Sequence, residues 1–444
     1  MTDWTVQTAA ELGRAIAAGK VDPVDLTEAF LDKIKDHPLS DRIYARTTPD
    51  RARAEARAAA ARARSGQRRS PLDGVPVSWK DLFDSAGVAT EAGSALLRDR
   101  VPETDAPVLR TATALGLVCL GKTHMSELAF SGLGLNPVTA TPPCINDADA
   151  VPGGSSSGAA ASVAFGLAAA GIGSDTGGSV RIPAAWNDLV GLKTTAGRIP
   201  LTGTVPLAAK FDTIGPLCRT VEDAALLLAA LEGGRAIDTR APASLKGRRF
   251  ANLLTVVQDD IRPEPAAAHA AALNRLRAAG ASVADIEVPE ITGPMGDSGV
   301  LYTTEAWGTW GETIAAQPDL MFALIRERFE GGKVVSGADY VAAWRRLDRV
   351  RAAWAAATAG FDAVLCPTAP NLPPKVDRLM TENDYYVTEN LLTLRNTRVG
   401  NLMGLAAITL PTGTPSCGLQ LLGRPMGEEP LLRLALSVEA ALSA

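Results

Sequence analysis

The chain has 444 residues, 46% of them hydrophobic and 21% charged, and its formal net charge is −5. This composition predicts a globular protein with a large core, and the length fits one large α/β unit or two to three domains. The nearly balanced charge favours neither nucleic acid nor an anionic membrane as a partner.

Cysteine usage and hydropathy indicate the compartment. The five cysteines are scattered singly, without a CxxC pair, which fits a reducing cytosol better than a disulfide framework. The first residues lack the basic-then-apolar pattern of a signal peptide. The longest apolar stretch, residues 159–172, is too short to cross a bilayer. We therefore expect a soluble, cytoplasmic protein.

In chain order, the first half of the sequence alternates helix and strand patterns. Residues 6–36 predict two helices separated at Asp22, since a proline after aspartate is typical of a helix start. The arginine- and alanine-rich segment 51–69 predicts a solvated surface helix. The elements expected next are a strand ending on Lys80, a helix capped at Thr104/Asp105 and ending at Gly116, a strand over 117–122, and a helix from Thr220 to Leu231 with a capping box to Asp223.

The second half continues this alternation, which favours an α/β layered architecture. Strands are predicted over 250–257, 282–288, 363–366, 405–410 and 419–422, with helices over 269–279 and 430–442. Residues 290–360 are mostly helical and rich in tryptophan, so a lid, a dimer face and plain core packing all remain open for this segment.

The most informative stretch lies between Pro152 and Pro183, where two glycine- and serine-rich clusters bracket a run of alanines. Glycine lets the backbone approach a ligand closely, and successive N–H groups in such a turn form a concavity that holds negative charge. A serine at the end of the turn is therefore a candidate nucleophile beside an oxyanion site. The alanine run is expected to be a buried helix that joins the clusters.

A nucleophilic serine needs a base, and the three histidines are weak candidates for that role. No zinc motif, GxSxG elbow or nucleotide loop is present. His37 and His269 fall in polar segments expected to be exposed, whereas His124 follows a strand and stays a candidate base. A lysine can serve instead if burial keeps it neutral. Lys80 ends an apolar strand and is the strongest candidate, with solvent exposure at the strand end as the alternative.

Five segments match one family. They are LDGVPVSWKDLF at 72–83, GKTHMSELAF at 121–130, PGGSSSG…GSDTGGSVRIPAAWNDLVGLKTT at 152–195, FDTIGPLCRTVEDAALL at 211–227, and the carboxyl-terminal ITLPTG…GLQLLGRP. Over nearly its whole length the chain resembles the amidase signature family of serine hydrolases. The resemblance implies an α/β amidase-signature fold in a single domain over 1–444, with a large mixed central β-sheet covered by α-helices on both faces and a catalytic core at about 65–240.

The resemblance also implies a site without cofactor or metal. Ser179 would be the nucleophile, Lys80 the base, and Ser155, on a cis peptide bond, the proton bridge between them. Other implied roles are an oxyanion hole on the N–H groups of Thr176, Gly177, Gly178 and Ser179, support from Ser174, Gly153 and Gly154, and a substrate pocket including Met125, Phe130 and Ser131. Asp175 and Arg181 are interpreted as structural residues, in ion pairs or fixing the loop, with substrate contact as the alternative. Two positions depart from the family: Ser157 replaces a glycine, and His124 replaces an asparagine.

The implied reaction is hydrolysis of the C–N bond of a small carboxamide, and carbamates, anilides, hydrazides and esters are open to the same chemistry. A homodimer is one expected state. The alternative function is the amidase-like component of a tRNA-dependent amidotransferase, which releases ammonia for a partner. A non-catalytic scaffold is disfavoured because Lys80, Ser155 and Ser179 occur together.

Overall fold

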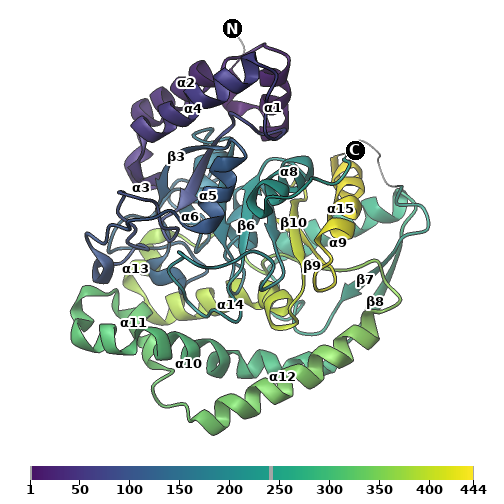
Figure 1. Ribbon diagram of the computed structural model, residues 1–444. Helices are drawn as coiled ribbons and strands as arrows, with labels where there is room; N and C mark the ends of the chain where they lie inside the picture. Colours follow the sequence, from purple (N-terminus) through teal and green to yellow (C-terminus); the bar gives the residue numbers. More distant parts are fainter. Residues whose placement is uncertain (1–2, 240–243, 444) are drawn as a thin grey trace.

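A mixed β-sheet runs through the computed structural model, which describes residues 3–239 and 244–443 (Figure 1). The order of its eleven strands is β1-β3-β2-β4-β6-β5-β10-β11-β9-β7-β8. The strands are β1 (Tyr44–Thr47), β2 (Pro76–Lys80), β3 (Val118–Thr123), β4 (Ala170–Ser174), β5 (Val190–Lys193), β6 (Ile214–Cys218), β7 (Arg249–Leu253), β8 (Ser282–Ile286), β9 (Ala363–Pro367), β10 (Ala407–Pro411) and β11 (Gly418–Leu422). The β3-β2-β4 and β9-β7-β8 groups are parallel, and the remaining neighbours are antiparallel.

Helices cover this sheet. Every residue of β2, β3, β4, β5, β6 and β9 is buried, so both faces of these strands are packed, as in an α/β fold. The α-helices in the described ranges are α1 (Ala9–Ala17), α2 (Pro23–Asp36), α3 (Ser40–Ile43), α4 (Pro49–Arg64), α5 (Pro107–Ala114), α6 (Ser157–Ala164), α7 (Arg181–Trp186), α8 (Val221–Glu232), α9 (Pro263–Ala278), α10 (Thr292–Ala316), α11 (Ala323–Glu330), α12 (Gly337–Thr358), α13 (Val376–Thr381), α14 (Asn383–Leu402) and α15 (Glu428–Ser443).

The caps at the starts of α2, α5 and α8 agree only in part with those predicted from the sequence. Asp22 caps α2 by accepting from Val24 N, as the aspartate–proline pair predicts. The capping prediction for α5 is wrong: the helix begins at Pro107 without a side-chain cap, because the Asp105 carboxylate binds Arg51 instead. Thr220 caps α8, but its capping box is incomplete, since Asp223 accepts from Ala10 N across the fold.

The alanine-rich run is not one helix. It forms α6 and then β4, because Gly166 adopts φ +71° after α6 and residues 170–174 pair with β2 and β6. The two glycine–serine clusters therefore lie at opposite ends of a helix–strand unit. One precedes α6, and the other follows β4.

The long helices α10 and α12 and the short helix α11 lie along one edge of the molecule, next to α14, with α1, α2 and α4 at the opposite edge (Figure 1). Aromatic contacts fasten this layer to the body. Phe211 stacks on Trp344 of α12 with ring centroids 5.1 Å apart and lies 4.5 Å from the ring of Tyr302 of α10. A role of this layer as a mobile lid or as a dimer face stays a prediction.

Three further features concern His269, the cysteines and the apolarity of the helices. His269 was expected to be exposed, but it is buried in α9, where its Nε2 lies 2.8 Å from Asn252 Oδ1. All five cysteines are buried and free of disulfide bonds. Among the described helices, none combines the length and apolarity needed to span a bilayer.

Candidate active site

Lys80 lies at the carboxyl end of β2, between β3 and β4, with its side chain fully buried. Its Nζ donates to Ser155 Oγ at 2.7 Å and to Ser174 Oγ at 2.8 Å. Burial lowers the pKa of Lys80 to about 7, although the charges of Asp212 and Asp175 oppose the shift. A substantial share of this amine is therefore neutral at neutral pH, and it contacts two hydroxyl groups.

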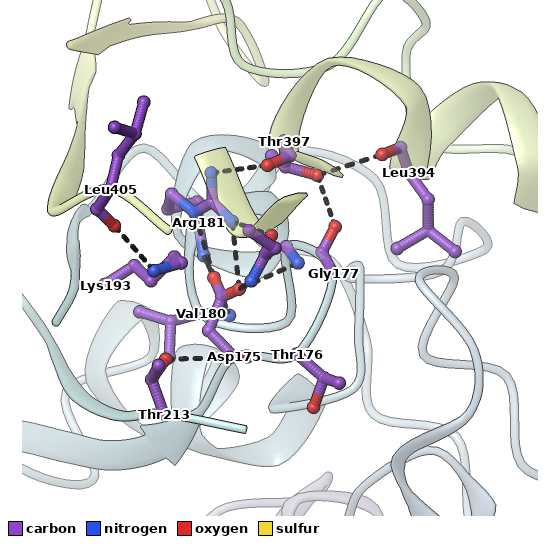
Figure 2. A network of polar contacts seen from close by, with 12 residues as sticks. Asp175, Thr176, Gly177, Val180, Arg181, Lys193, Thr213, Leu394, Thr397 and Leu405 are labelled. Carbon is purple, nitrogen blue, oxygen red and sulfur yellow. Dashed lines mark hydrogen bonds and ion pairs between the residues drawn. The ribbon is translucent and has the colours of Figure 1, made fainter. Parts of the chain in front are cut away.

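A second lysine shows that a low pKa alone does not mark a site. Burial also lowers the pKa of Lys193 to about 7. Its Nζ, however, donates to the carbonyl oxygens of Thr194 and Leu405, which have no proton to exchange (Figure 2). Of these two lysines, only Lys80 contacts serine hydroxyls.

Ser155 lies on the segment that leads into α6, and the peptide bond from Gly154 to Ser155 is cis. Gly154 has no room for a side chain, because a Cβ there would lie 2.5 Å from Ser126 Oγ and 2.6 Å from Gly134 N. The next residue, Ser156, ties this segment to the end of β4: its Oγ donates to the carbonyl of Ser174, 3.2 Å away. Sequence reasoning assigned no role to Ser156.

The second cluster forms a loop whose carbonyl groups are held on its outer side. The carbonyl of Asp175 accepts from Thr213 Oγ1 at 2.7 Å, and that of Gly178 accepts from Ile182 N at 2.8 Å. In a trans peptide the N–H points opposite to the C=O. The N–H groups of Thr176 and Ser179 are thus turned to the other side, and neither they nor the N–H of Gly177 donate to any residue that the structure describes.

The N–H of Gly178 is different, because it donates to Asp175 Oδ1 at 2.8 Å. Of the four N–H groups expected to form an oxyanion hole, that of Gly178 is therefore already paired, whereas those of Thr176, Gly177 and Ser179 have no partner among the described residues. Ser179, which follows, is almost fully buried, and its carbonyl accepts from Ser156 N at 3.1 Å. Its Oγ forms no hydrogen bond within the described ranges.

The loop is anchored by the buried ion pair of Asp175 and Arg181, as expected (Figure 2). Arg181 donates from Nε and Nη2 to the two oxygens of Asp175, each at 2.9 Å. It also donates to the Thr397 carbonyl and to Gln420. Burial raises the pKa of Asp175, but the Arg181 guanidinium outweighs it and holds that pKa below its usual range. The carboxylate is therefore charged and structural.

A small cavity of about 20 Å³ adjoins this loop. Residues from six separate parts of the chain line it: Ala129, Phe130, Ser131, Thr176, Gly177, Ser179, Leu207, Tyr302, Arg328, Leu394 and Arg398. Phe130 and Ser131 lie where the sequence placed them. Met125 does not line it, since its side chain is wholly buried in the core.

His124 is also absent from the lining. Its backbone carbonyl accepts from Gly158 N at 2.9 Å and from Ser157 Oγ at 3.3 Å, so this segment positions the start of α6. Sequence reasoning missed Arg328 and Arg398. Nothing near them in the sequence marks them as site residues, because α11 and α14 reach the cavity only through the tertiary fold.

The fold is that of amidases, and the comparison with known families agrees. The family model described as Amidase matches residues 25–432, and the chain belongs to this family. It is therefore a C–N hydrolase.

Particular relatives extend over the whole chain. It is 37% identical to the 2-amino-5-chloromuconic acid deaminase of Comamonas testosteroni, covering 98% of this chain and 97% of the relative. It is 34% identical to the A component of the glutamyl-tRNA(Gln) amidotransferase of Anaeromyxobacter sp. (strain K), covering 97% and 95%. Among solved structures, the native peptide amidase of Stenotrophomonas maltophilia superposes with a TM-score of 0.83 at 28% identity, covering 99% of this chain and 97% of that one.

Proposed function

We propose that this chain hydrolyses the C–N bond of a carboxamide through an acyl-enzyme on Ser179. The observation that carries the proposal is the buried Lys80, whose pKa is lowered to about 7 and whose Nζ is hydrogen-bonded to Ser155 and Ser174. Ser179 lines the adjoining cavity. A neutral amine, a bridging hydroxyl and a serine beside a cavity are the parts that serine acylation needs.

In the proposed reaction, Ser179 Oγ attacks the substrate carbonyl carbon as its proton passes to Ser155 Oγ, while the Ser155 proton passes to neutral Lys80. The hydrogen bond from Ser179 to Ser155 is expected to form when substrate binds, because such contacts tighten in the loaded enzyme. The oxyanion is stabilised by the N–H groups of Thr176, Gly177 and Ser179. The C–N bond then breaks, and the leaving nitrogen takes the proton back through Ser155.

The second half of the cycle uses water. Water attacks the Ser179 ester, its proton follows the same path to Lys80, and collapse of the intermediate returns a proton to Ser179 and releases the acid. Ser174 holds Lys80 in place through the whole cycle. Carbamates, anilides, hydrazides and esters form the same tetrahedral oxyanion, so they fall within the proposed chemistry.

A fluorophosphonate probe tests the nucleophile. Wild type is expected to be labelled, and Ser179→Ala is expected to lose both labelling and amide hydrolysis. Ser157→Ala is the matched control, since it removes a buried serine hydroxyl of the same stretch that bonds only the His124 carbonyl. Labelling that survives Ser179→Ala would contradict the assignment.

The similarity to the A components of amidotransferases supports a second candidate, ammonia release for a partner. Ammonia release from simple amides by the purified chain alone separates the two. Free hydrolysis at ordinary rates supports the stand-alone enzyme, and turnover only in the presence of added partner proteins supports the alternative. The five unpaired cysteines support a cytoplasmic location, and light scattering tests the expected homodimer.

A further inference from the structure

Two arginine side chains line the cavity beside Ser179 without a carboxylate partner. Arg328 lies on α11 and Arg398 on α14. Nη1 of Arg328 is buried and has no hydrogen-bond partner in the described chain. Arg398 is buried and donates from Nη1 to Ser298 Oγ at 3.1 Å. Among residues 3–239 and 244–443, no carboxylate lies within ion-pair distance of either guanidinium.

Arg181, a buried arginine with a structural role, differs from these two because it has a full set of partners. Arg181 is matched by the Asp175 carboxylate and by two side-chain amide oxygens, those of Gln420 and Asn401. Leaving a charge buried and unpaired costs several kcal/mol. Departures of this kind are expected where a ligand completes the pairing.

Both cavity arginines keep their charge. Burial and the neighbouring charge of Arg398 lower the pKa of Arg328 to about 10, and burial lowers that of Arg398, yet guanidinium groups stay protonated at neutral pH. Each is thus a cation near another cation. The pair gives the cavity a positive potential that no described carboxylate neutralises by direct contact.

Two further groups complete the arrangement. Tyr302 Oη is buried, lines the same cavity and has no hydrogen-bond partner among the described residues. Burial raises the pKa of this phenol, so it remains an O–H donor. The Phe130 ring lies 4.3 Å from the Arg328 guanidinium, which leaves the N–H edge of that planar group for a planar anion.

We propose that the substrate carries a carboxylate, which Arg328, Arg398 and the Tyr302 hydroxyl bind while Ser179 attacks the amide carbonyl of the same molecule. This inference rests on the proposed function and names its substrate class: compact acid amides, such as monoamides of short dicarboxylic acids. The cavity is small, about 20 Å³, so a bound substrate must be compact.

The test compares acid amides with neutral amides of the same shape. Monoamides of the three- to six-carbon dicarboxylic acids are assayed by ammonia release against analogues in which an isopropyl group replaces the carboxylate, for example succinamate against 4-methylpentanamide. Wild type is expected to favour its best acid amide by about 30-fold or more in kcat/KM, the loss typical when a buried charge pair is broken. Arg328→Met and Arg398→Met are expected to abolish this preference, because each lowers kcat/KM for the acid amide far more than for the neutral analogue.

Arg326→Met is the matched control, because Arg326 also lies on α11 but pairs with Asp319 at the surface. It is expected to keep the preference. Arg328→Lys, which keeps charge but not the forked geometry, is expected to keep part of it. Because each Met variant removes a guanidinium that has no carboxylate partner among the described residues, its melting temperature is expected to equal or exceed that of wild type.

Calorimetric binding of free succinate gives a readout that needs no turnover, with wild type binding it and Arg328→Met not. Equal kcat/KM for acid and neutral amides, or succinate binding unaffected by both Met variants, overturns the carboxylate proposal and leaves the amidase proposal standing. Absence of any amide hydrolysis and of fluorophosphonate labelling, with succinate still bound through the arginines, overturns the proposed function instead.

Discussion

Thr397 Oγ1 donates a hydrogen bond of 2.7 Å to the carbonyl oxygen of Gly177, a residue 220 positions earlier in the chain (Figure 2). The peptide that begins at this carbonyl ends at the N–H of Gly178, which the Asp175 carboxylate binds. Both sides of one peptide group are thereby fixed. Gly178 must stay glycine, since it adopts φ +136° and a Cβ would lie 2.1 Å from Thr397 Oγ1.

Replacement of this hydroxyl tests how strongly α14 positions the loop. Thr397→Val is expected to lower kcat about 10-fold with a smaller change in KM, because the loop N–H groups lose a fixed direction toward the oxyanion. Thr393→Val, one turn earlier on α14, loses a hydrogen bond to Asn371 instead. It is expected to cost similar stability, about 1 kcal/mol, with kcat unchanged. Equal effects on kcat would contradict the positioning role.

The rate should follow the ionisation of Lys80. Protonated lysine cannot accept a proton, so kcat/KM is expected to fall tenfold per pH unit below about 7 and to level off above it. Lys80→Arg is expected to be inactive across this range, because a guanidinium stays charged. Lys193→Met is expected to show the same fall in kcat/KM below about pH 7. If the fall moved to another pH in that variant, the ionisation would belong to Lys193 and not to Lys80.

Loss of the buried ion pair should remove much of the protein's margin of stability. Arg181→Met leaves the Asp175 carboxylate buried and unpaired, so its cost in urea unfolding is expected to be about 3–5 kcal/mol. The comparison is Arg346→Met, which breaks the exposed pair with Asp297 and is expected to leave the unfolding midpoint unchanged. Similar midpoints for the two variants would refute the structural role of the buried pair.

His269 should make the fold sensitive to acid. Burial, with a contribution from the charge of Arg277, lowers its pKa to about 4. The unfolded chain takes up this proton near pH 6.5 and the folded chain only near 4, so stability is full above 6.5 and declines as pH falls toward 4. Wild type is expected to lose about 3 kcal/mol more than His269→Gln between about pH 7 and 4. His37→Gln, at a half-exposed site, serves as control. If the stability of wild type and of His269→Gln fell equally with pH, His269 would not be the cause of the acid sensitivity.

Local signals in the sequence were enough to locate the lysine and the two serine clusters. Lys80 ends an apolar strand, and its burial follows because β2 lies between two other strands of the sheet. The prediction of a mixed α/β fold is confirmed, as is membership in the amidase family. The catalytic roles of Lys80, Ser155 and Ser179 stay predictions.

The errors have physical causes that a linear reading does not contain. The run is rich in alanine, a good helix former, yet Gly166 ends α6 and sheet pairing imposes a strand on the second half. His269 lies between two runs of alanine that do not mark either face of the helix, and α9 turns it inward toward Asn252. Arg328 and Arg398 differ from surface arginines only in what surrounds them after folding.

The anchoring of Arg181 by Gln420 and by the Thr397 carbonyl has a consequence for biosynthesis. The serine-bearing loop leaves the ribosome well before its last structural partners do, because Gln420 lies 239 positions after Arg181. A nascent chain that lacks β11 therefore carries Lys80, Ser155 and Ser179 without a finished oxyanion loop. Activity is expected to begin only after β11 has been synthesised and Gln420 has bound Arg181.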